Sequence, residues 1–204
     1  LGDIVNSAPV YVAGPSFGYA NDFESASYGA FADLYKNRKK VVYVGANDGM
    51  LHAFNAETGA ELLAYVPGAV YGSLSQLSSP TYVHRYYVDG TPTVGDVFYA
   101  GAWHTLLVAG MRAGAKGVFA LDVTNPEIFS ESSNNARAIV RWEFQDATDM
   151  GYVFGQPLLV KTNFNGKWAV IVGGGYQSSS GNAVLFVLDA QTGEVIKRLD
   201  TGSG

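Results

Sequence analysis

Residues Val41–Gly59 read VVYVGANDGMLHAFNAETG: an apolar run, a Gly-containing turn, a second apolar run and a polar residue that leads into another turn. The same order returns in Leu106–Pro126 (LLVAGMRAGAKGVFALDVTNP) and in Ala169–Gly193 (AVIVGGGYQSSSGNAVLFVLDAQTG). The polar residues that close the second run follow one another at intervals of 67 residues: Asn55, Asp122 and Asp189. A repeat of this length built from short strands predicts the blades of a β-propeller.

Each of these segments is preceded by one further β-rich run and followed by another. The preceding runs have a proline near their start, where a strand need not donate to the ladder: Ile4–Val12, Val88–Phe98 and Tyr152–Val160. The following runs are Glu61–Val66, Ala138–Phe144 and Glu194–Leu199. Four runs per unit match a four-stranded antiparallel blade. We therefore expect an all-β fold with three blades, at roughly residues 1–82, 83–148 and 149–204, which together form one partial propeller domain over 1–204.

Turns and insertions fit the same scheme. Asn47-Asp48-Gly49 lies between two strands and is a strong hairpin signal, because such turns need positive φ. The first unit is longer than the others and holds two helix-like pieces, around Ser27–Asn37 and Ala69–Leu77. Three blades do not close a ring, so we expect the chain to be part of a larger one. Its two outer blades should then leave open edges that favour self-association.

Period-two alternation identifies the residues expected inside the blades. They are Val42, Val44, Leu51, Ala53, Leu107, Val118, Ala120, Val170, Val172, Leu185 and Val187.

The amino-acid composition excludes several classes of protein and of functional site. Hydrophobic residues make up 48% and charged residues only 15%, which is typical of a globular chain rather than a disordered one. The net charge of −5 argues against binding to nucleic-acid phosphates. Because the chain has no cysteine, thiol nucleophiles, Cys-based metal sites and disulfides are excluded.

No motif nominates a catalytic, cofactor or metal site. His52, His84 and His104 lie in none of the usual metal-binding spacings, so packing or surface positions are expected for them. The Gly-rich stretches Gly110–Gly117 and Gly173–Gly175 are followed by strands rather than helices, which favours hairpins over phosphate cradles. The carboxylates that follow or precede turns form no calcium loop: Asp48, Asp89, Asp96, Asp146, Asp149 and Asp189. We expect a protein that is not an enzyme.

Aromatic residues offer a different kind of site. Trp103, Trp142 and Trp168 are expected to pack between blades. The cluster of Tyr82, Tyr86 and Tyr87 has two interpretations, packing or an amphipathic partner-binding surface, since aromatic side chains favour interfaces.

Several long strings, in the order in which they occur, resemble the C-terminal domain of PilY1-type proteins, the type IV pilus biogenesis factors and tip-associated adhesins. They are Val41–Phe54, Tyr65–Pro67, His84–Val97, Lys116–Asp122, Tyr152–Pro157 and Val187–Gly193. The resemblance implies a quinoprotein-like β-propeller, exported to the outer membrane surface, the pilus tip or the extracellular space. It also implies roles in pilus assembly, adhesion, twitching motility and surface sensing. The partners that it implies are minor pilins or other pilus proteins, and host or abiotic surfaces.

Relatives in this family carry a calcium loop of the Asp-x-Asp-x-Asp-Gly type, and no stretch of this chain matches it. Calcium is therefore not carried over, and no cofactor is expected. Two other functions remain open. A pyrroloquinoline-quinone-type dehydrogenase shares the blade repeat, but its adjacent cysteine pair is absent here. A general partner-binding propeller is the other, because fold alone does not decide function.

Overall fold

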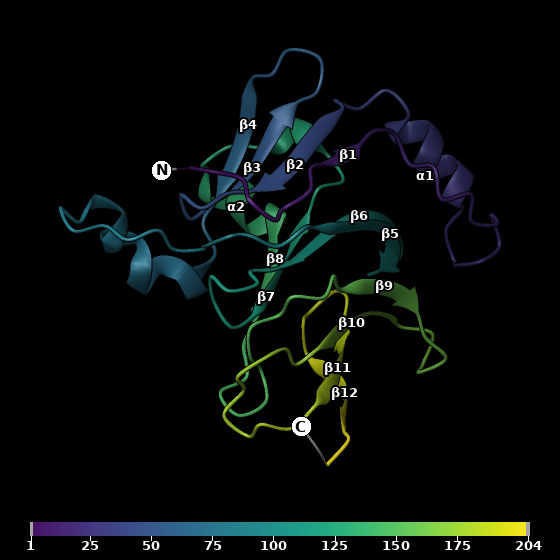
Figure 1. Ribbon diagram of the computed structural model, residues 1–204. Helices are drawn as coiled ribbons and strands as arrows, with labels where there is room; N and C mark the ends of the chain where they lie inside the picture. Colours follow the sequence, from purple (N-terminus) through teal and green to yellow (C-terminus); the bar gives the residue numbers. More distant parts are fainter. Residues whose placement is uncertain (1, 203–204) are drawn as a thin grey trace.

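The computed structural model describes residues 2–202 and consists mostly of three four-stranded antiparallel sheets that fan out one beside the next (Figure 1). The first sheet holds β1 (Val10–Val12), β2 (Val41–Gly45), β3 (Leu51–Asn55) and β4 (Glu61–Tyr65). The second holds β5 (Thr93–Tyr99), β6 (Ala102–Gly110), β7 (Val118–Asp122) and β8 (Val140–Phe144). The third holds β9 (Leu158–Lys161), β10 (Trp168–Gly173), β11 (Val184–Asp189) and β12 (Val195–Asp200). The strands of each sheet pair in sequence order, so the predicted all-β class of blade-like sheets is confirmed.

Prolines and glycines set the ends of the strands. The first strand of each sheet begins directly after a proline, namely Pro9, Pro92 or Pro157. A proline there removes no ladder hydrogen bond. Gly49 closes the predicted hairpin between β2 and β3 with a φ of +98°, a conformation that side chains with a Cβ rarely adopt. The blade boundaries at residues 82 and 148 stay a prediction.

The helices differ in part from the sequence prediction. The predicted helix around Ser27–Asn37 is α1 (Tyr28–Tyr35), where the Ser27 side chain accepts a hydrogen bond from the Ala30 N–H. The piece around Ala69–Leu77 is not an α-helix but the 3-10 helix η1 (Gly68–Ser78). Its glycine and serine residues have low α-helical propensity. No helix in residues 2–202 is long and apolar enough to cross a membrane.

The outer strand of the second sheet starts later than predicted. The segment Ala138–Phe144 begins in α2 (Ser133–Ile139), and only β8 continues as strand. α2 follows a second, shorter 3-10 helix, η2 (Pro126–Ile128). Because α2 spans seven residues and buries only Ile139, it has no apolar periodicity that sequence analysis could detect.

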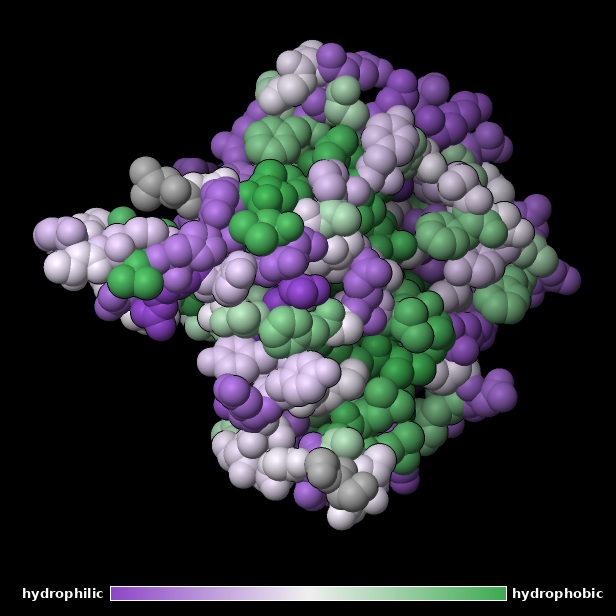
Figure 2. All heavy atoms as spheres, in the orientation of Figure 1, coloured by the Kyte–Doolittle hydropathy of each residue, from purple (hydrophilic) through white to green (hydrophobic). Residues whose placement is uncertain are grey.

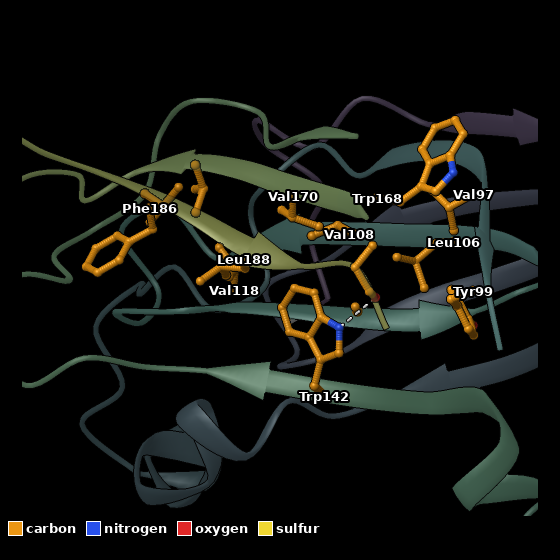
Figure 3. Packing of buried hydrophobic residues seen from close by; sticks show 14 of the residues in the cluster. Val97, Tyr99, Leu106, Val108, Val118, Trp142, Trp168, Val170, Phe186 and Leu188 are labelled. Carbon is orange, nitrogen blue, oxygen red and sulfur yellow. Dashed lines mark hydrogen bonds between the residues drawn. The ribbon is translucent and has the colours of Figure 1, made fainter. Parts of the chain in front are cut away.

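Two apolar cores hold the three sheets together. One lies between the first and second sheets and includes Tyr43, Leu51, Leu107 and Phe119. The other lies between the second and third sheets, where Val108, Val118, Val170, Phe186 and Leu188 meet (Figure 3). The second sheet is therefore covered on both faces, whereas each outer sheet is covered by a neighbouring sheet on one face only.

Trp142 joins the second sheet to the turn that follows β11. Its Nε1–H donates to the Ala190 carbonyl oxygen at 3.0 Å, the bond drawn in Figure 3. A Cβ on Gly193 would come within 2.7 Å of the indole ring, so the ring packs directly on the backbone of this glycine. This is the packing between blades that was predicted for the tryptophans. Trp103 and Trp168 are also buried in the same core.

Most of the predicted interior residues are buried, and the exceptions share one position in the fold. Val44, Leu51, Ala53, Leu107, Val118, Ala120, Val170 and Val172 are buried as expected. The prediction is wrong for Leu185, which is 38% exposed, and Val42 and Val187 are only half-buried. All three exceptions lie on the outward face of an outer sheet, where no further sheet covers them.

The segment between β1 and β2 ties the three sheets together. The Trp103 Nε1–H donates to the Ala26 carbonyl oxygen at 2.8 Å, and the Trp168 Nε1–H donates to Glu24 Oε1 at 2.8 Å. Tyr19 packs between these two indole rings, stacked on Trp103 and edge-on to Trp168. The insertion in the first unit therefore reaches the second and third sheets.

Candidate partner-binding surface

An arm formed by residues 68–86 projects from the body of the three sheets (Figure 1). It contains η1 and the extended segment that leads to β5. Its exposed apolar side chains are Tyr71, Val83 and Tyr86. Exposed aromatic side chains of this kind are enriched in protein interfaces. The arm is therefore a candidate surface for contact with another protein.

The three predicted tyrosines have different positions in this arm. Tyr86 is exposed and Tyr82 is half-buried, so both rings reach the surface. Tyr87 is fully buried, which leaves no ring surface for a partner. Its N–H donates to Asn47 Oδ1 at 3.0 Å and its hydroxyl donates to the Ser73 carbonyl oxygen at 3.0 Å. Tyr87 thus anchors the arm to the turn between β2 and β3. Partner binding through Tyr82 and Tyr86 stays a prediction.

Each histidine pairs with a carboxylate, which the sequence spacing did not indicate. His84 Nε2 lies 2.9 Å from Asp3 Oδ2, and His104 Nδ1 lies 2.7 Å from Asp122 Oδ2. His52 lies between Asp48 and Glu61, at 3.0 and 2.5 Å. Strand pairing brings His52 to Glu61 and His104 to Asp122, so linear spacing gives no signal of these two contacts. Within residues 2–202, no group of three or more His, Asp or Glu side chains is arranged to hold a metal ion.

Asp96 is a buried carboxylate with a structural role. It accepts hydrogen bonds from the Tyr28 hydroxyl at 2.6 Å and from Thr105 Oγ1 at 2.7 Å. Burial raises the pKa of Asp96, although these hydrogen bonds and the nearby Arg38 guanidinium lower it in part. Arg38 itself donates to the Thr124 carbonyl oxygen at 2.9 Å. The cluster fixes the insertion of the first unit on the second sheet.

Other carboxylates stabilise the turns that follow them. Asp189 accepts the N–H groups of Gln191 and Thr192 at 2.8 and 3.2 Å, and Lys167 Nζ at 2.5 Å. Asp146 accepts the Thr148 N–H at 3.0 Å. The Gly-rich stretches connect antiparallel strands β6–β7 and β10–β11, as the hairpin interpretation predicted.

The sequence analysis did not find one group of exposed aromatic side chains, at the end of the third sheet. Tyr152 and Phe154 precede β9, and Tyr176 lies in the loop between β10 and β11. The rings of Phe154 and Tyr176 meet edge to face, with centroids 5.5 Å apart. Their sequence separation is large and no motif links them, so only the fold brings them together.

Comparison with known proteins gives consistent results along the whole chain. The family model described as the PilY1 beta-propeller domain matches residues 1–204. The type IV pilus biogenesis factor PilY1 of Pseudomonas aeruginosa is 42% identical over 98% of this chain. A homologue of that factor in Xylella fastidiosa is 42% identical over 100% of it.

A solved structure agrees with these sequence relatives. The crystal structure of the Pseudomonas aeruginosa PilY1 C-terminal domain superposes with a TM-score of 0.76 at 39% identity and covers 93% of this chain. The chain spans 17% and 14% of the two curated relatives and 36% of the crystallised domain. It therefore corresponds to part of those proteins and to part of the crystallised domain.

Proposed function

Because the chain belongs to the PilY1 β-propeller family, we propose that it contributes a non-enzymatic propeller segment to a type IV pilus biogenesis factor. The segment acts through protein–protein contacts at the pilus tip or the cell surface. Its partners are minor pilins or other pilus proteins, and the protein that carries it is exported. The observation that carries this proposal is the match of the family model over residues 1–204.

The structure supports contact rather than catalysis. The carboxylates with the strongest burial bind backbone or side-chain donors of the fold, as Asp96 does with Tyr28 and Thr105. The exposed side chains of the projecting arm include aromatic ones, such as Tyr71 and Tyr86. Such side chains supply contact area with little loss of conformational entropy, which suits a partner-binding surface.

Complementation tests this function. The full-length protein that carries this sequence is expressed in a type IV piliated strain that lacks its own PilY1-type factor. We expect surface pili to return and minor pilins to co-purify with the protein. Tyr71→Ala combined with Tyr86→Ala should weaken this co-purification, while Phe164→Ala, an exposed residue of the β9–β10 turn, serves as the matched control. The proposal would be contradicted if the unmodified protein neither restored pili nor retained any pilin.

A further inference from the structure

Three aromatic side chains form an open corner at the end of the third sheet, beside the turn between β6 and β7. Tyr152 is half-buried, Phe154 is 40% exposed and Tyr176 is 69% exposed. Together with Ala113 and Gln177 they line a hollow of about 520 Å³. We propose that this aromatic corner binds an extended, proline-containing acidic segment of a partner protein.

The aromatic corner is built on rigid backbone. Tyr152 and Tyr176 exchange backbone hydrogen bonds in both directions, at 2.8 and 3.0 Å. Gly175 has a φ of +77°, and a Cβ at this position would collide with the Tyr152 carbonyl oxygen. Gly151 packs in the same way against the Tyr176 carbonyl oxygen. Because the rings stand on backbone that cannot move apart easily, little ordering is needed when a ligand binds, which favours affinity.

Two cationic side chains lie against rings of the aromatic corner. The Arg112 guanidinium carbon lies 4.8 Å from the centre of the Phe154 ring, and Lys116 Nζ lies 5.3 Å from the centre of the Tyr152 ring. None of the five residues that line the hollow is acidic. Two ring faces already hold cations, so a cationic ligand would meet repulsion. A ligand that carries carboxylates is favoured, although the chain as a whole has a net charge of −5.

A buried carboxylate, Asp89, helps to position the Arg112 side chain. Asp89 Oδ2 lies 3.5 Å from the Arg112 Nε, in an ion pair without a hydrogen bond, and accepts the Asn6 Nδ2–H at 2.6 Å. A guanidinium carries five N–H donors, and this contact uses only the Nε side of the group. Arg112 can therefore hold its place over Phe154 and still donate to a carboxylate outside the protein.

The shape of the hollow indicates an extended peptide rather than a small molecule. Small-ligand pockets surround most of the ligand surface, and a corner open to solvent with five lining residues does not. Polyproline II segments bind grooves lined by exposed aromatic rings, and their backbone carbonyls stay free to accept hydrogen bonds. Here the Gln177 amide and the tyrosine hydroxyls are the nearby donors. The proposal rests on the proposed role in protein contacts and adds the chemistry of one partner segment.

Peptide titration tests the aromatic corner directly. The full-length protein is titrated calorimetrically with a decapeptide of glutamate and proline (EPPEPPEPPE) and with its lysine counterpart (KPPKPPKPPK). We expect saturable binding of the acidic peptide only. Tyr176→Ala should weaken this binding by about tenfold or more, as loss of an exposed aromatic anchor does. Phe164→Ala, at an exposed position of the β9–β10 turn, is the matched control and should leave it unchanged.

A second variant tests the charge. Lys116→Gln should weaken binding of the acidic peptide and make it less sensitive to salt, because one screened attraction is lost. Absence of binding up to millimolar acidic peptide would overturn the proposal. The proposal would also be overturned if the lysine peptide bound equally well, or if Tyr176→Ala bound the acidic peptide as the parent does. Saturable binding of a neutral oligosaccharide without binding of the acidic peptide would overturn it as well.

Complementation separates this inference from the proposed function. If the acidic peptide binds but the protein neither restores pili nor retains a pilin, the aromatic corner stands and the pilus function fails. If pili return and pilins co-purify while the peptide does not bind, the pilus function stands and the aromatic corner is refuted.

Discussion

The outward faces of the first and third sheets occupy opposite sides of the structure and differ in chemistry. On the first sheet, His52 pairs with Asp48 and Glu61, and the N-terminal segment runs along the adjoining turn, where the Asn47 N–H donates to the Asp3 carbonyl oxygen at 3.0 Å. The outward face of the third sheet has exposed leucines on both of its edge strands. It carries Leu158, which is 58% exposed, and Leu199, which is 46% exposed. Figure 2 shows hydrophobic side chains gathered over β9–β12.

Equivalent residues of the repeat explain this difference. Leu51 and Ala53 of β3 face the second sheet, and Val118 and Ala120 of β7 face the third. The residues 67 positions further on are Leu185 and Val187 of β11, which face outward. The same sequence position is thus buried wherever another sheet follows it. The third sheet therefore has the face of an inner blade without the neighbour that would cover it.

The largest expected effect on the free energy of unfolding comes from placing an aspartate on one face of the third sheet or on the other. Val172→Asp places a carboxylate in the core between the second and third sheets, and should cost roughly 3 kcal/mol or more of the free energy of unfolding. Leu185→Asp, on the outward face, should change this free energy by about 0.5 kcal/mol or less. Urea denaturation of the isolated chain measures both. Equal destabilisation by the two variants would show that the outward face is covered from within.

Self-association of the isolated chain is expected to use the third sheet rather than the first. Exposed apolar surface favours association, so Leu158→Lys with Leu199→Lys should weaken it by about tenfold or more. Tyr11→Lys, which lies on the outward face of the first sheet, is the matched control. Sedimentation velocity at several concentrations distinguishes the variants. A parent chain that stays monomeric at high micromolar concentration would contradict this prediction.

A smaller effect is expected where the second sheet meets the third. Trp142→Phe keeps an aromatic ring near Gly193 but removes the hydrogen bond to the Ala190 carbonyl oxygen. Loss of that bond and of part of the ring should cost about 1–2 kcal/mol. Tyr65→Phe, which removes the hydroxyl that bonds Glu143 at an exposed position, should cost less. Thermal denaturation compares them, and an equal loss in both variants would argue against a special role for Trp142.

Sequence alone predicted the sheets because each strand run is short, apolar and bounded by Gly or Pro. It also predicted that Leu185 would be buried, since alternation identifies which residues share a face but not whether another sheet covers that face. The helix α2 was missed because Ile139 is its one buried residue.

The candidate sites were harder to predict than the fold. Tyr87 was grouped with Tyr82 and Tyr86 because they are close in sequence, yet the extended chain places Tyr87 in the core. The aromatic corner was missed for the opposite reason. Tyr152 and Tyr176 meet only through backbone pairing between two loops, and a single sequence carries no signal of such pairing.

The smallest expected effect concerns an ion pair between β12 and the loop that precedes β9, and its pH dependence has a definite sign. Arg198 Nε donates to Asp149 Oδ2 at 2.5 Å, and this hydrogen bond lowers the pKa of Asp149 below its ordinary value of 3.8. A carboxyl group with a lowered pKa stabilises the folded state above its ordinary pKa, and this contribution is lost as the pH falls through the lowered value. Asp149→Asn should therefore be less stable than the parent at pH 7, and the difference should shrink below about pH 4.

The exposed pair of Lys40 and Glu57, beside the first sheet, supplies the comparison. Glu57→Gln should change stability less at pH 7, because both side chains of that pair are screened by solvent. Denaturation midpoints at pH 3 and pH 7 measure both variants, and a deficit of Asp149→Asn that grows toward low pH would show that this ion pair does not stabilise the third sheet.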